Sequence, residues 1–387
     1  MDDMRVALVG PYPASEGSVF GGVEAATSSL ADGLAALDEV EVHAVTAVAG
    51  LRSYTHKVTH SGVHVHLLPL FRKLGCLTAF AIDRGRIRAK LREINPDIIH
   101  IHTQLMYGYS ALERGWPSVL TPHGIYHRET ASKRGLDRLQ TRLGCRYEAN
   151  SLRRARHIIA INRYSIREYG SYVRTNDIRY IDNSIKDHWF NVADHAEPGR
   201  ILFGGFIYDL KNLLYLLEAM AELADSHPTI RLRVAGSVRE QGYYDRCLKL
   251  VADRGIEKNV DFLGPLSVEG MVEEHSKASL VALASKQENA PIIISEAMAA
   301  AKPVVGTNVG GIAEMVADGE SGYVVPLDDV KTLADRIHRL LSDDDLRKRM
   351  GQAGKAIAEQ RFKRSVVVSK TLDFYREIIE NERGRRI

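Results

Sequence analysis

The sequence predicts an α/β protein built from two doubly wound domains that face each other across a cleft. Short apolar segments alternate with longer segments of helical periodicity, which is typical of a parallel sheet covered by helices on both faces. This alternation occurs in both halves of the chain. The length of 387 residues also fits two domains of ordinary size.

The apolar segments that predict strands are distributed over both halves. In the first half they span residues 6–9, 40–46, 63–68, 98–102, 118–121 and 158–161. In the second half they span residues 200–203, 232–235, 260–263, 280–284, 303–306 and 322–325. Helical periodicity occupies the intervals, for example at 23–37, at 84–94 and in the leucine-rich segment that ends at His227-Pro228.

The boundary between the domains is predicted near residues 184–199, where a polar segment precedes a new apolar strand. We expect a first domain over residues 1–185, a second over 186–365, and a helix over 366–387 that packs back on the first domain. Ligands usually bind doubly wound sheets at the carboxyl ends of the strands, so a site in the cleft between the domains is predicted.

Composition argues against several classes of protein. The chain carries 52 Lys and Arg residues against 49 Asp and Glu, and a formal charge of +3 is too small to indicate nucleic-acid binding. Cys76, Cys145 and Cys247 are too widely spaced for a disulfide framework or a Cys-x-x-Cys metal site. The N-terminus is unlike a secretory signal, and no segment is apolar enough to predict a membrane span. The sequence therefore predicts a cytoplasmic protein.

Two clusters of basic residues lie in the first half. Residues 128–156 contain nine basic and three acidic side chains, and residues 72–92 contain seven basic side chains and the single acid Asp83. One interpretation is a pair of solvated helix faces. The other is attraction to a phosphorylated acceptor or to an anionic membrane at its inner face, where each basic residue contributes about 1 kcal/mol.

The segment most informative about chemistry spans residues 285–327. Pro291 suits the first turn of a helix, which Lys302-Pro303 then ends. Glu288 is expected just ahead of this helix and Glu296 about two turns along it. The free amides of the helix N-terminus suit a diphosphate, and the carboxylates suit sugar and ribose hydroxyls. Two glutamates at this spacing also arise by chance, as a capping acid and a surface acid.

Glycines and one lysine follow other predicted strands. Gly310-Gly311 and Gly21-Gly22 each precede a predicted helix in a setting compatible with a bound phosphate. For an isolated glycine pair such as Gly310-Gly311, a tight turn with positive φ is the alternative explanation. Lys211 is placed to neutralise a diphosphate, or is a surface lysine near a helix start. Neither Gly-x-Gly-x-x-Gly nor a P-loop motif is present, which argues against a dehydrogenase and a P-loop nucleotidase.

Together these segments resemble the retaining glycosyltransferases of family 4, and the resemblance covers nearly the whole chain. The markers occur in order as Gly21-Gly22-Val23-Glu24, Asp97-Ile98-Ile99-His100-Ile101-His102, Thr121-Pro122-His123-Gly124, Asp182-Asn183-Ser184, Lys211-Asn212, Glu288 to Glu296 continuing to Val305, Gly310-Gly311, Glu314 and Asp318-Gly319-Glu320-Ser321-Gly322. The resemblance implies the GT-B architecture, with an N-terminal Rossmann-like domain for the acceptor and a C-terminal one for a nucleotide-sugar donor.

The resemblance also implies an activity and partners. The activity would be hexosyl transfer from a UDP- or GDP-sugar to an acceptor hydroxyl, in the assembly of a polysaccharide, a lipopolysaccharide or a glycolipid. The acceptor would be a glycan, a lipid-linked molecule or a small molecule. A peripheral contact with an anionic membrane would be compatible with the assembly of such products.

The same resemblance implies roles for individual residues. Glu288 would contact the transferred sugar, Glu296 the ribose, and Lys211 the diphosphate, while His123 would reach the donor sugar from the opposite domain. The other implied donor-binding residues are Asn289, Ala290, Pro291, Ile292, Gly205, Gly21 and Gly22.

Three positions depart from the family pattern. Phe206 stands where members commonly carry an arginine, five residues before the lysine, and Arg239 is a candidate to replace it. Asn289-Ala290-Pro291 replaces glycine-rich residues after Glu288, and Asp182-Asn183-Ser184 replaces Pro-Asn-Gly. These departures bear on the identity of the donor more than on the class of reaction.

Retention implies an oxocarbenium-like transition state while negative charge builds on the leaving diphosphate. Lys211 and the helix that follows Pro291 are expected to stabilise this charge, with no metal or other cofactor. The leaving phosphate is the expected base for the acceptor hydroxyl. A double displacement with Glu288 as nucleophile is the alternative.

Two further groups resemble metal ligands but are interpreted otherwise. Asp343-Asp344-Asp345 matches Asp-x-Asp, yet it is predicted to open a helix, where acids complement the helix dipole. His100 and His102 lie on one predicted strand, and we expect them to point to opposite faces, which would exclude a metal pair.

Two alternatives to a glycosyltransferase remain open at this point. A nucleotide-sugar 2-epimerase on the same fold would convert the donor without an acceptor. A non-catalytic sugar-nucleotide-binding protein, which Phe206 makes conceivable, would have no transfer activity for a Lys211 or Glu288 variant to lose.

Overall fold

The computed structural model describes residues 3–15, 21–71, 75, 78–112, 116–129 and 136–384. Parts of both basic clusters, and Cys76, lie outside these residues. The chain divides into two compact units, one formed by Met1–Ser184 with Arg364–Ile387 and the other by Ile185–Lys363. The divisions predicted from the sequence, after residues 185 and 365, differ from these by one and two residues.

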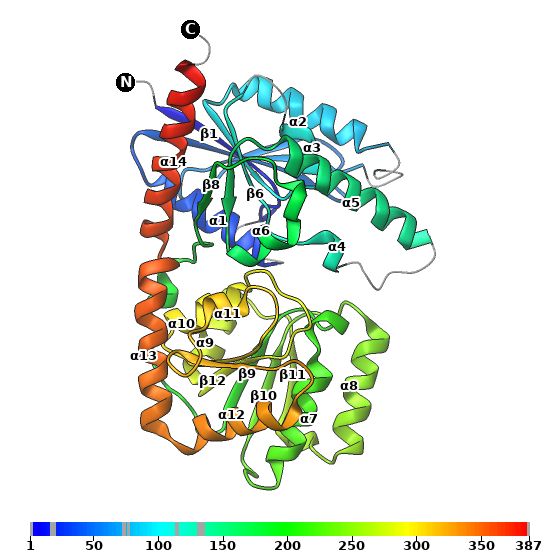
Figure 1. Ribbon diagram of the computed structural model, residues 1–387, viewed down its shortest axis with the longest axis vertical. Helices are drawn as coiled ribbons and strands as arrows, with labels where there is room; N and C mark the ends of the chain where they lie inside the picture. Colours follow the sequence, from blue (N-terminus) through cyan, green and yellow to red (C-terminus); the bar gives the residue numbers. More distant parts are fainter. Residues whose placement is uncertain are drawn as a thin grey trace. The chain divides into compact units, whose positions relative to one another are not determined.

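Within its described residues, the first unit contains an eight-stranded sheet in the order β3-β4-β2-β1-β5-β6-β7-β8. Figure 1 labels strands β1, β6 and β8 of this sheet. The strands are β1 Met4–Val9, β2 Val40–Val48, β3 Thr55–Val58, β4 His64–Pro69, β5 Ile98–His102, β6 Ser118–Thr121, β7 Ile158–Ala160 and β8 Ile178–Tyr180. In this part of the chain, β3 and β4 pair antiparallel at one edge and the other neighbours are parallel.

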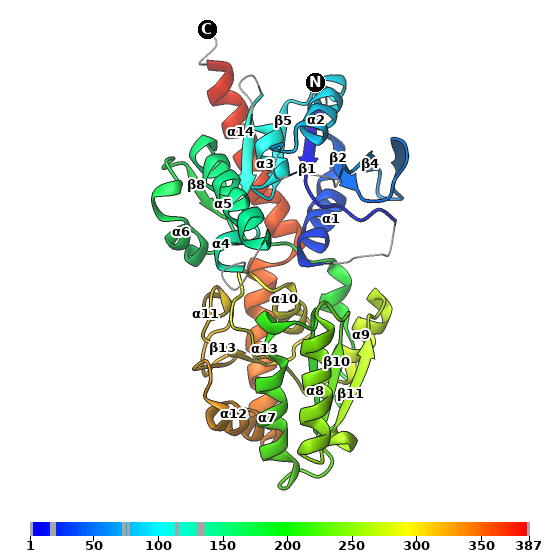
Figure 2. The same cartoon turned by 90° about the vertical axis from the view of Figure 1, so that its right-hand side faces the viewer.

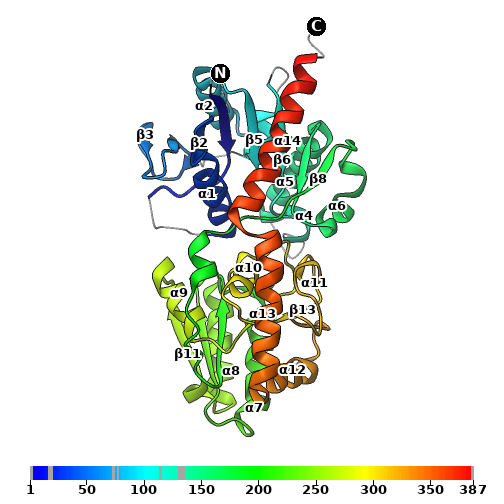
Figure 3. The ribbon, with the colours of Figure 1, turned by 90° about the vertical axis from the view of Figure 1, so that its left-hand side faces the viewer.

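Helices cover both faces of this sheet. The described helices are α1 Gly22–Ala35, α2 Ala81–Ile94, α3 Met106–Ala111, α4 Tyr126–Glu129, α5 Leu136–Arg154, α6 Arg163–Tyr169 and α14 Arg364–Gly384. Leu34 of α1 and Tyr375 of α14 share one buried core, so the C-terminal helix lies beside α1 (Figure 3). Leu91 of α2 and Leu152 of α5 belong to the core on the opposite face.

The sequence predicted six strands of this sheet but missed β3 and β8. β3 reads Thr-His-Lys-Val and is largely exposed, and β8 is three residues long with Tyr180 exposed. Both are edge strands, which need no continuous apolar run because only one side pairs with a neighbour. The predicted helices at 23–37 and 84–94 correspond to α1 and α2 with shifted ends.

The second unit, every residue of which is described, contains a six-stranded parallel sheet in the order β11-β10-β9-β12-β13-β14. The strands are β9 Arg200–Gly204, β10 Arg231–Ala235, β11 Val260–Gly264, β12 Leu280–Leu283, β13 Val304–Thr307 and β14 Gly322–Val325. The sequence predicted all six. The order reverses between β9 and β12, which is the position where ligands usually bind to a doubly wound sheet.

The helices of the second unit are α7 Leu213–Ala224, α8 Gln241–Asp253, α9 Val268–Lys277, α10 Ile292–Ala299, α11 Ile312–Met315, α12 Val330–Ser342 and α13 Asp344–Arg361. α7 and α8 pack side by side on one face of the sheet (Figure 2). On the other face α10 approaches β9 closely, since a Cβ on Gly204 would lie 2.1 Å from Ile293 Cδ1. The missing side chain at Gly204 therefore sets the position of α10 against the sheet.

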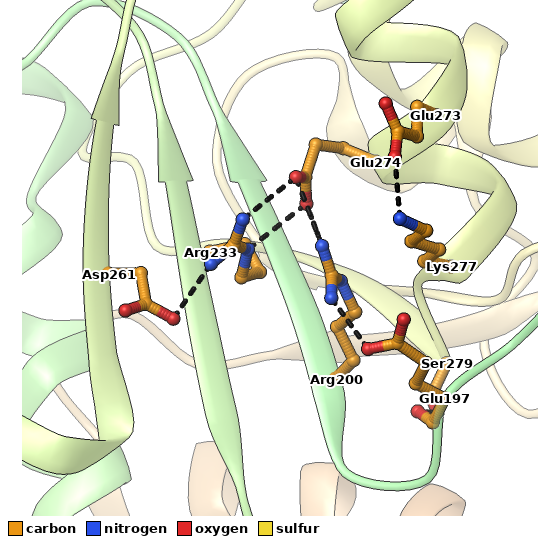
Figure 4. A network of polar contacts seen from close by, with 8 residues as sticks. All are labelled: Glu197, Arg200, Arg233, Asp261, Glu273, Glu274, Lys277 and Ser279. Carbon is orange, nitrogen blue, oxygen red and sulfur yellow. Dashed lines mark hydrogen bonds and ion pairs between the residues drawn. The ribbon is translucent and has the colours of Figure 1, made fainter.

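A charged network joins strands β9, β10 and β11 to α9 (Figure 4). The carboxylate of Glu274 accepts two hydrogen bonds from Arg200, at 2.9 and 3.0 Å, and others from Arg233, which also binds Asp261 at 2.8 Å. Although burial opposes its ionisation, the guanidiniums of Arg233 and Arg200 hold the pKa of Glu274 below its ordinary value. The network therefore stabilises the sheet through one buried anion and two cations.

Replacing Glu274 by Gln should lower the free energy of unfolding by about 2–3 kcal/mol, because the partly buried guanidiniums of Arg200 and Arg233 each lose one of their charged partners. Urea denaturation measures this loss. Since the folded pKa is lowered, the contribution is present above the ordinary carboxyl pKa and is lost as the pH falls through the folded value. The control is Glu273→Gln, an exposed residue paired with Lys277, which should leave the urea midpoint unchanged because water screens the exposed pair. Equal losses in the two variants would contradict this account.

Candidate functional site

The candidate site of the second unit lies at the carboxyl edge of its sheet, where the strand order reverses. Lys211 lies at the end of a short 3-10 helix, Asp209–Lys211, in the loop after β9. Glu288 lies in the loop after β12. Residues 77 positions apart in the sequence therefore meet because their strands are neighbours.

Lys211 and Glu288 form an ion pair. Lys211 Nζ donates to Glu288 Oε1 at 2.5 Å, and the hydroxyl of Ser285 donates to the same oxygen at 2.7 Å. The two charged side chains are 17% and 10% exposed, so water screens the pair only weakly. Gly205 lies beneath the lysine, since a Cβ on this glycine would be 3.4 Å from Lys211 Cε. Sequence reasoning missed Ser285, although its place three residues before Glu288 was a usable signal.

The loop that carries Glu288 depends on the glycine pair after β13. Gly311 N donates to the carbonyl oxygen of Glu288 at 3.2 Å. A Cβ on Gly310 would lie 1.7 Å from that oxygen, and the φ of Gly310 is +58°. Only glycine fits this position, because both the close approach and the left-handed backbone exclude a side chain. Gly310-Gly311 thus supports the Glu288 loop directly.

The other predicted donor-binding residues of this unit flank α10. Asn289 and Pro291 are buried and lead into the helix, which begins at Ile292. Pro291 is therefore the residue before the helix, and Glu296 lies about one turn along it, so the prediction of two turns was wrong. In the loop before Ile292, Glu288 is bound by Lys211 from the loop after β9 and by Gly311 from the loop after β13. Ala290 lies in the same loop and is half-buried.

Glu296 is half-buried on α10 and has an unusual titration. Burial raises the pKa of Glu296 to about 8. The side chain is therefore largely protonated at neutral pH and becomes an anion in mildly alkaline solution. A carboxyl group of this kind can both donate and accept hydrogen bonds near neutrality.

In the first unit, His123 belongs to a stack of buried imidazoles. His102 Nδ1 and His123 Nε2 share a hydrogen bond at 2.9 Å, and the rings of His100 and His102 are 4.0 Å apart. The expectation that His100 and His102 point to opposite faces was wrong, since residues two apart on a strand share a face. His100 also bonds Tyr375 of α14 and Thr121 of β6, both at 2.6 Å.

Burial keeps these histidines neutral. It lowers the pKa of His123 to about 4 and that of His100 to about 3, and it holds that of His102 well below its ordinary value. The stack is therefore a set of hydrogen-bonding groups rather than a set of charges at neutral pH. The contact of His123 with a donor sugar stays a prediction.

The loop after β6, which carries His123, is held by hydrogen bonds to the buried carboxylate of Glu148. Gln104 Nε2 donates to Glu148 Oε1 at 2.7 Å, and Tyr126 N donates to the same oxygen at 2.9 Å. Gln104 also donates to the carbonyl of Gly124 at 2.5 Å. Sequence reasoning missed Gln104 and Glu148, because neither follows a motif or a recognisable spacing.

Gly21 and Gly22 lie at the start of α1. Gly21 is the N-cap residue with an extended backbone, φ −175°, and a Cβ there would meet nothing within 4 Å. Gly22 is the first residue of the helix. Among the described residues, nothing packs so closely that position 21 requires glycine, and the predicted approach of a donor phosphate to Gly21 and Gly22 stays a prediction.

Asp343-Asp344-Asp345 opens α13, as the sequence predicted. Asp343 Oδ1 accepts a hydrogen bond from Leu346 N at 2.8 Å, which makes it the N-cap. Within the described part of the chain, no group of three or more His, Cys, Asp or Glu side chains is arranged to hold a metal ion. A separate feature concerns membranes. Among the described residues, no helix has the length and apolar composition that crossing a bilayer requires.

Solved structures share this fold. Sucrose-phosphate synthase from Thermosynechococcus elongatus superposes with a TM-score of 0.82 over 98% of this chain and 100% of that protein, at 18% identity. Anabaena HepE in complex with UDP-glucose gives a TM-score of 0.74 over 97% of this chain and 100% of that one, at 20% identity. The fold is therefore the two-domain α/β architecture of GT-B glycosyltransferases.

Curated relatives match a shorter part of the chain. D-inositol 3-phosphate glycosyltransferase of Streptomyces bingchenggensis is 33% identical over 191 residues, which is 48% of this chain and 42% of the relative. Alpha-D-kanosaminyltransferase of Streptomyces kanamyceticus is 31% identical over 178 residues, 46% of this chain and 45% of the relative. The matches thus span less than half the length of these relatives.

Two family models match in succession. Glycosyltransferase Family 4 matches residues 20–188, and Glycosyl transferases group 1 matches residues 186–357. The resemblance drawn from the motifs is confirmed. Because the two models together extend from residue 20 to residue 357, the chain belongs to the family 4 glycosyltransferases.

Proposed function

We propose that this protein transfers a sugar from a nucleotide-diphosphate sugar to an acceptor hydroxyl, with retention at the anomeric carbon. The observation that carries the proposal is the contact of Lys211 with Glu288 at the reversal of strand order, beside the N-terminus of α10. Membership of the family and the name of the Streptomyces bingchenggensis relative support a transferase. The UDP-glucose complex of HepE supports a uridine nucleotide as the first donor to test.

In the proposed reaction, the bond between the anomeric carbon and the diphosphate oxygen breaks while the acceptor oxygen bonds to the same face of that carbon. Lys211 and the amides that open α10 would stabilise the negative charge on the departing diphosphate, so this assignment calls on no metal or other cofactor. The leaving phosphate would take the proton of the acceptor hydroxyl. Glu288, 2.5 Å from Lys211, would hold the sugar hydroxyls and orient the lysine.

The acceptor class is proposed more broadly. A glycan, a lipid-linked sugar and a small polyol phosphate are the classes to compare, the last because one relative is named for D-inositol 3-phosphate. A role in polysaccharide, lipopolysaccharide or glycolipid assembly would follow from the first two classes. The trapping of a sugar covalently bound to Glu288 would instead favour the double displacement.

Lys211→Ala and Glu288→Gln should each lower kcat on the order of 100-fold, because each removes a group that acts on the transition state. The measurement starts from a panel of UDP- and GDP-sugars screened by thermal stabilisation, followed by acceptor-dependent release of the nucleoside diphosphate, which should persist in EDTA. The matched control is Lys286→Ala, since Lys286 lies in the Glu288 loop but pairs with Asp209 at 2.9 Å. Conversion of the donor without acceptor would instead establish an epimerase, and binding without turnover a non-catalytic protein.

The affinity for a nucleoside diphosphate should rise about tenfold between pH 7 and pH 9 if only ionised Glu296 accepts hydrogen bonds from both ribose hydroxyls. The affinity should rise rather than fall, because the pKa of Glu296 is about 8 and raising the pH through this value increases the ionised fraction of Glu296. Calorimetric titration with UDP at several pH values measures the slope. In Glu296→Gln the slope should vanish, and an equal slope in that variant would assign the titration to another group.

We also propose that the basic surface of the first unit binds anionic membranes. Arg142 and Arg146 are exposed one turn apart on α5, and neither forms an ion pair with a described residue. The wild type should sediment with phosphatidylglycerol vesicles at low salt and dissociate as salt rises. Arg142→Glu with Arg146→Glu should weaken this binding several-fold, whereas Lys348→Glu with Arg349→Glu on α13 should not. Indifference to lipid charge would favour a solvated helix face and a water-soluble acceptor.

A further inference from the structure

The loops at the carboxyl edge of the second sheet contain three cations near the strand-order reversal, and two of them are already matched by acids. Lys211 pairs with Glu288 at 2.5 Å, and Lys286 pairs with both oxygens of Asp209 at 2.9 Å. The third, Arg239, lies in the loop between β10 and α8. Its guanidinium is exposed and forms no ion pair with any described residue.

Arg239 is nevertheless held in place by aromatic rings. Its guanidinium carbon lies 4.1 Å from the ring centre of Phe206 and 5.5 Å from that of Tyr208. An aromatic face attracts the cation but accepts no conventional hydrogen bond, so the N–H groups at the guanidinium edge stay available to a ligand. The contact thus orients a charge while leaving its hydrogen-bonding capacity unused.

The backbone fixes this arrangement to the site. Ile207 N donates to the carbonyl of Ser237 at 2.9 Å, and Arg239 N donates to the carbonyl of Ile207 at 3.0 Å. These two hydrogen bonds therefore join the loops after β9 and β10 beside the stacked pair of Arg239 and Phe206. Phe206 directly follows Gly205, the glycine over which Lys211 lies, so Arg239 and Lys211 belong to the same edge of the sheet.

We propose that Arg239 binds the diphosphate of the nucleotide donor as a second cation beside Lys211. This inference rests on the proposed function. A diphosphate ester carries at least two negative charges, and the charge of Lys211 is largely offset by Glu288. An unmatched guanidinium with free N–H groups supplies the missing positive charge and can bridge two phosphate oxygens. Phe206 acts as its support and does not contact the ligand in this proposal.

The test measures binding of UDP and GDP by calorimetry, with uridine and guanosine followed by ligand-detected NMR as uncharged controls. Arg239→Ala should weaken binding of the diphosphate about tenfold and leave nucleoside binding unchanged, because one charge-assisted contact is lost. Phe206→Leu keeps an apolar side chain but removes the ring, and should weaken diphosphate binding about two- to fivefold.

Arg246→Ala is the matched control, since Arg246 is also an exposed arginine stacked on an aromatic ring, that of Tyr243 at 5.2 Å. This variant should bind UDP and GDP like the wild type. An Arg239→Ala protein that keeps wild-type affinity for the bound diphosphate overturns the inference alone. A wild type that binds neither UDP nor GDP overturns the proposed function and this inference with it.

Discussion

The ion pair between Lys211 and Glu288 is the interaction on which the candidate site depends. It joins the loops that follow β9 and β12, the two strands between which the order of the second sheet reverses. At this point successive crossovers leave in opposite directions, so the loops do not cover one another and a polar pair can remain accessible from one side. The low exposure of both side chains makes their electrostatic coupling stronger than that of a surface pair.

Close backbone approaches make that pair possible. Gly204 lets α10 lie against β9, and Gly310 lets the β13 loop touch the carbonyl of Glu288. Both glycines leave free the space that a side chain would occupy. At the same edge, the guanidinium of Arg239 lies against the ring of Phe206.

The first unit has the same kind of sheet but different interactions at its carboxyl edge. Its carboxyl edge carries neutral, stacked histidines joined to α14 through Tyr375, and the loop after β6 rests on the buried carboxylate of Glu148. Hydrogen bonds among imidazoles and to one buried carboxylate fix this edge. The two units therefore differ in the interactions at the carboxyl edges of their sheets: stacked, neutral imidazoles in the first and the ion pair of Lys211 with Glu288 in the second.

The sequence by itself determined the alternation of strands and helices, the six strands of the second sheet, and the order of the family motifs, because burial and helix periodicity leave a local pattern in the chain. It could not place β3 or β8, whose edge positions require little apolar character, nor the turn at which Glu296 lies. Only the tertiary structure decided that Lys211 meets Glu288 and Ser285, that Arg239 stacks on Phe206, and that Glu148 supports the His123 loop. These contacts join residues whose strands are neighbours in the sheet but distant along the chain, and no local pattern encodes which loops will meet.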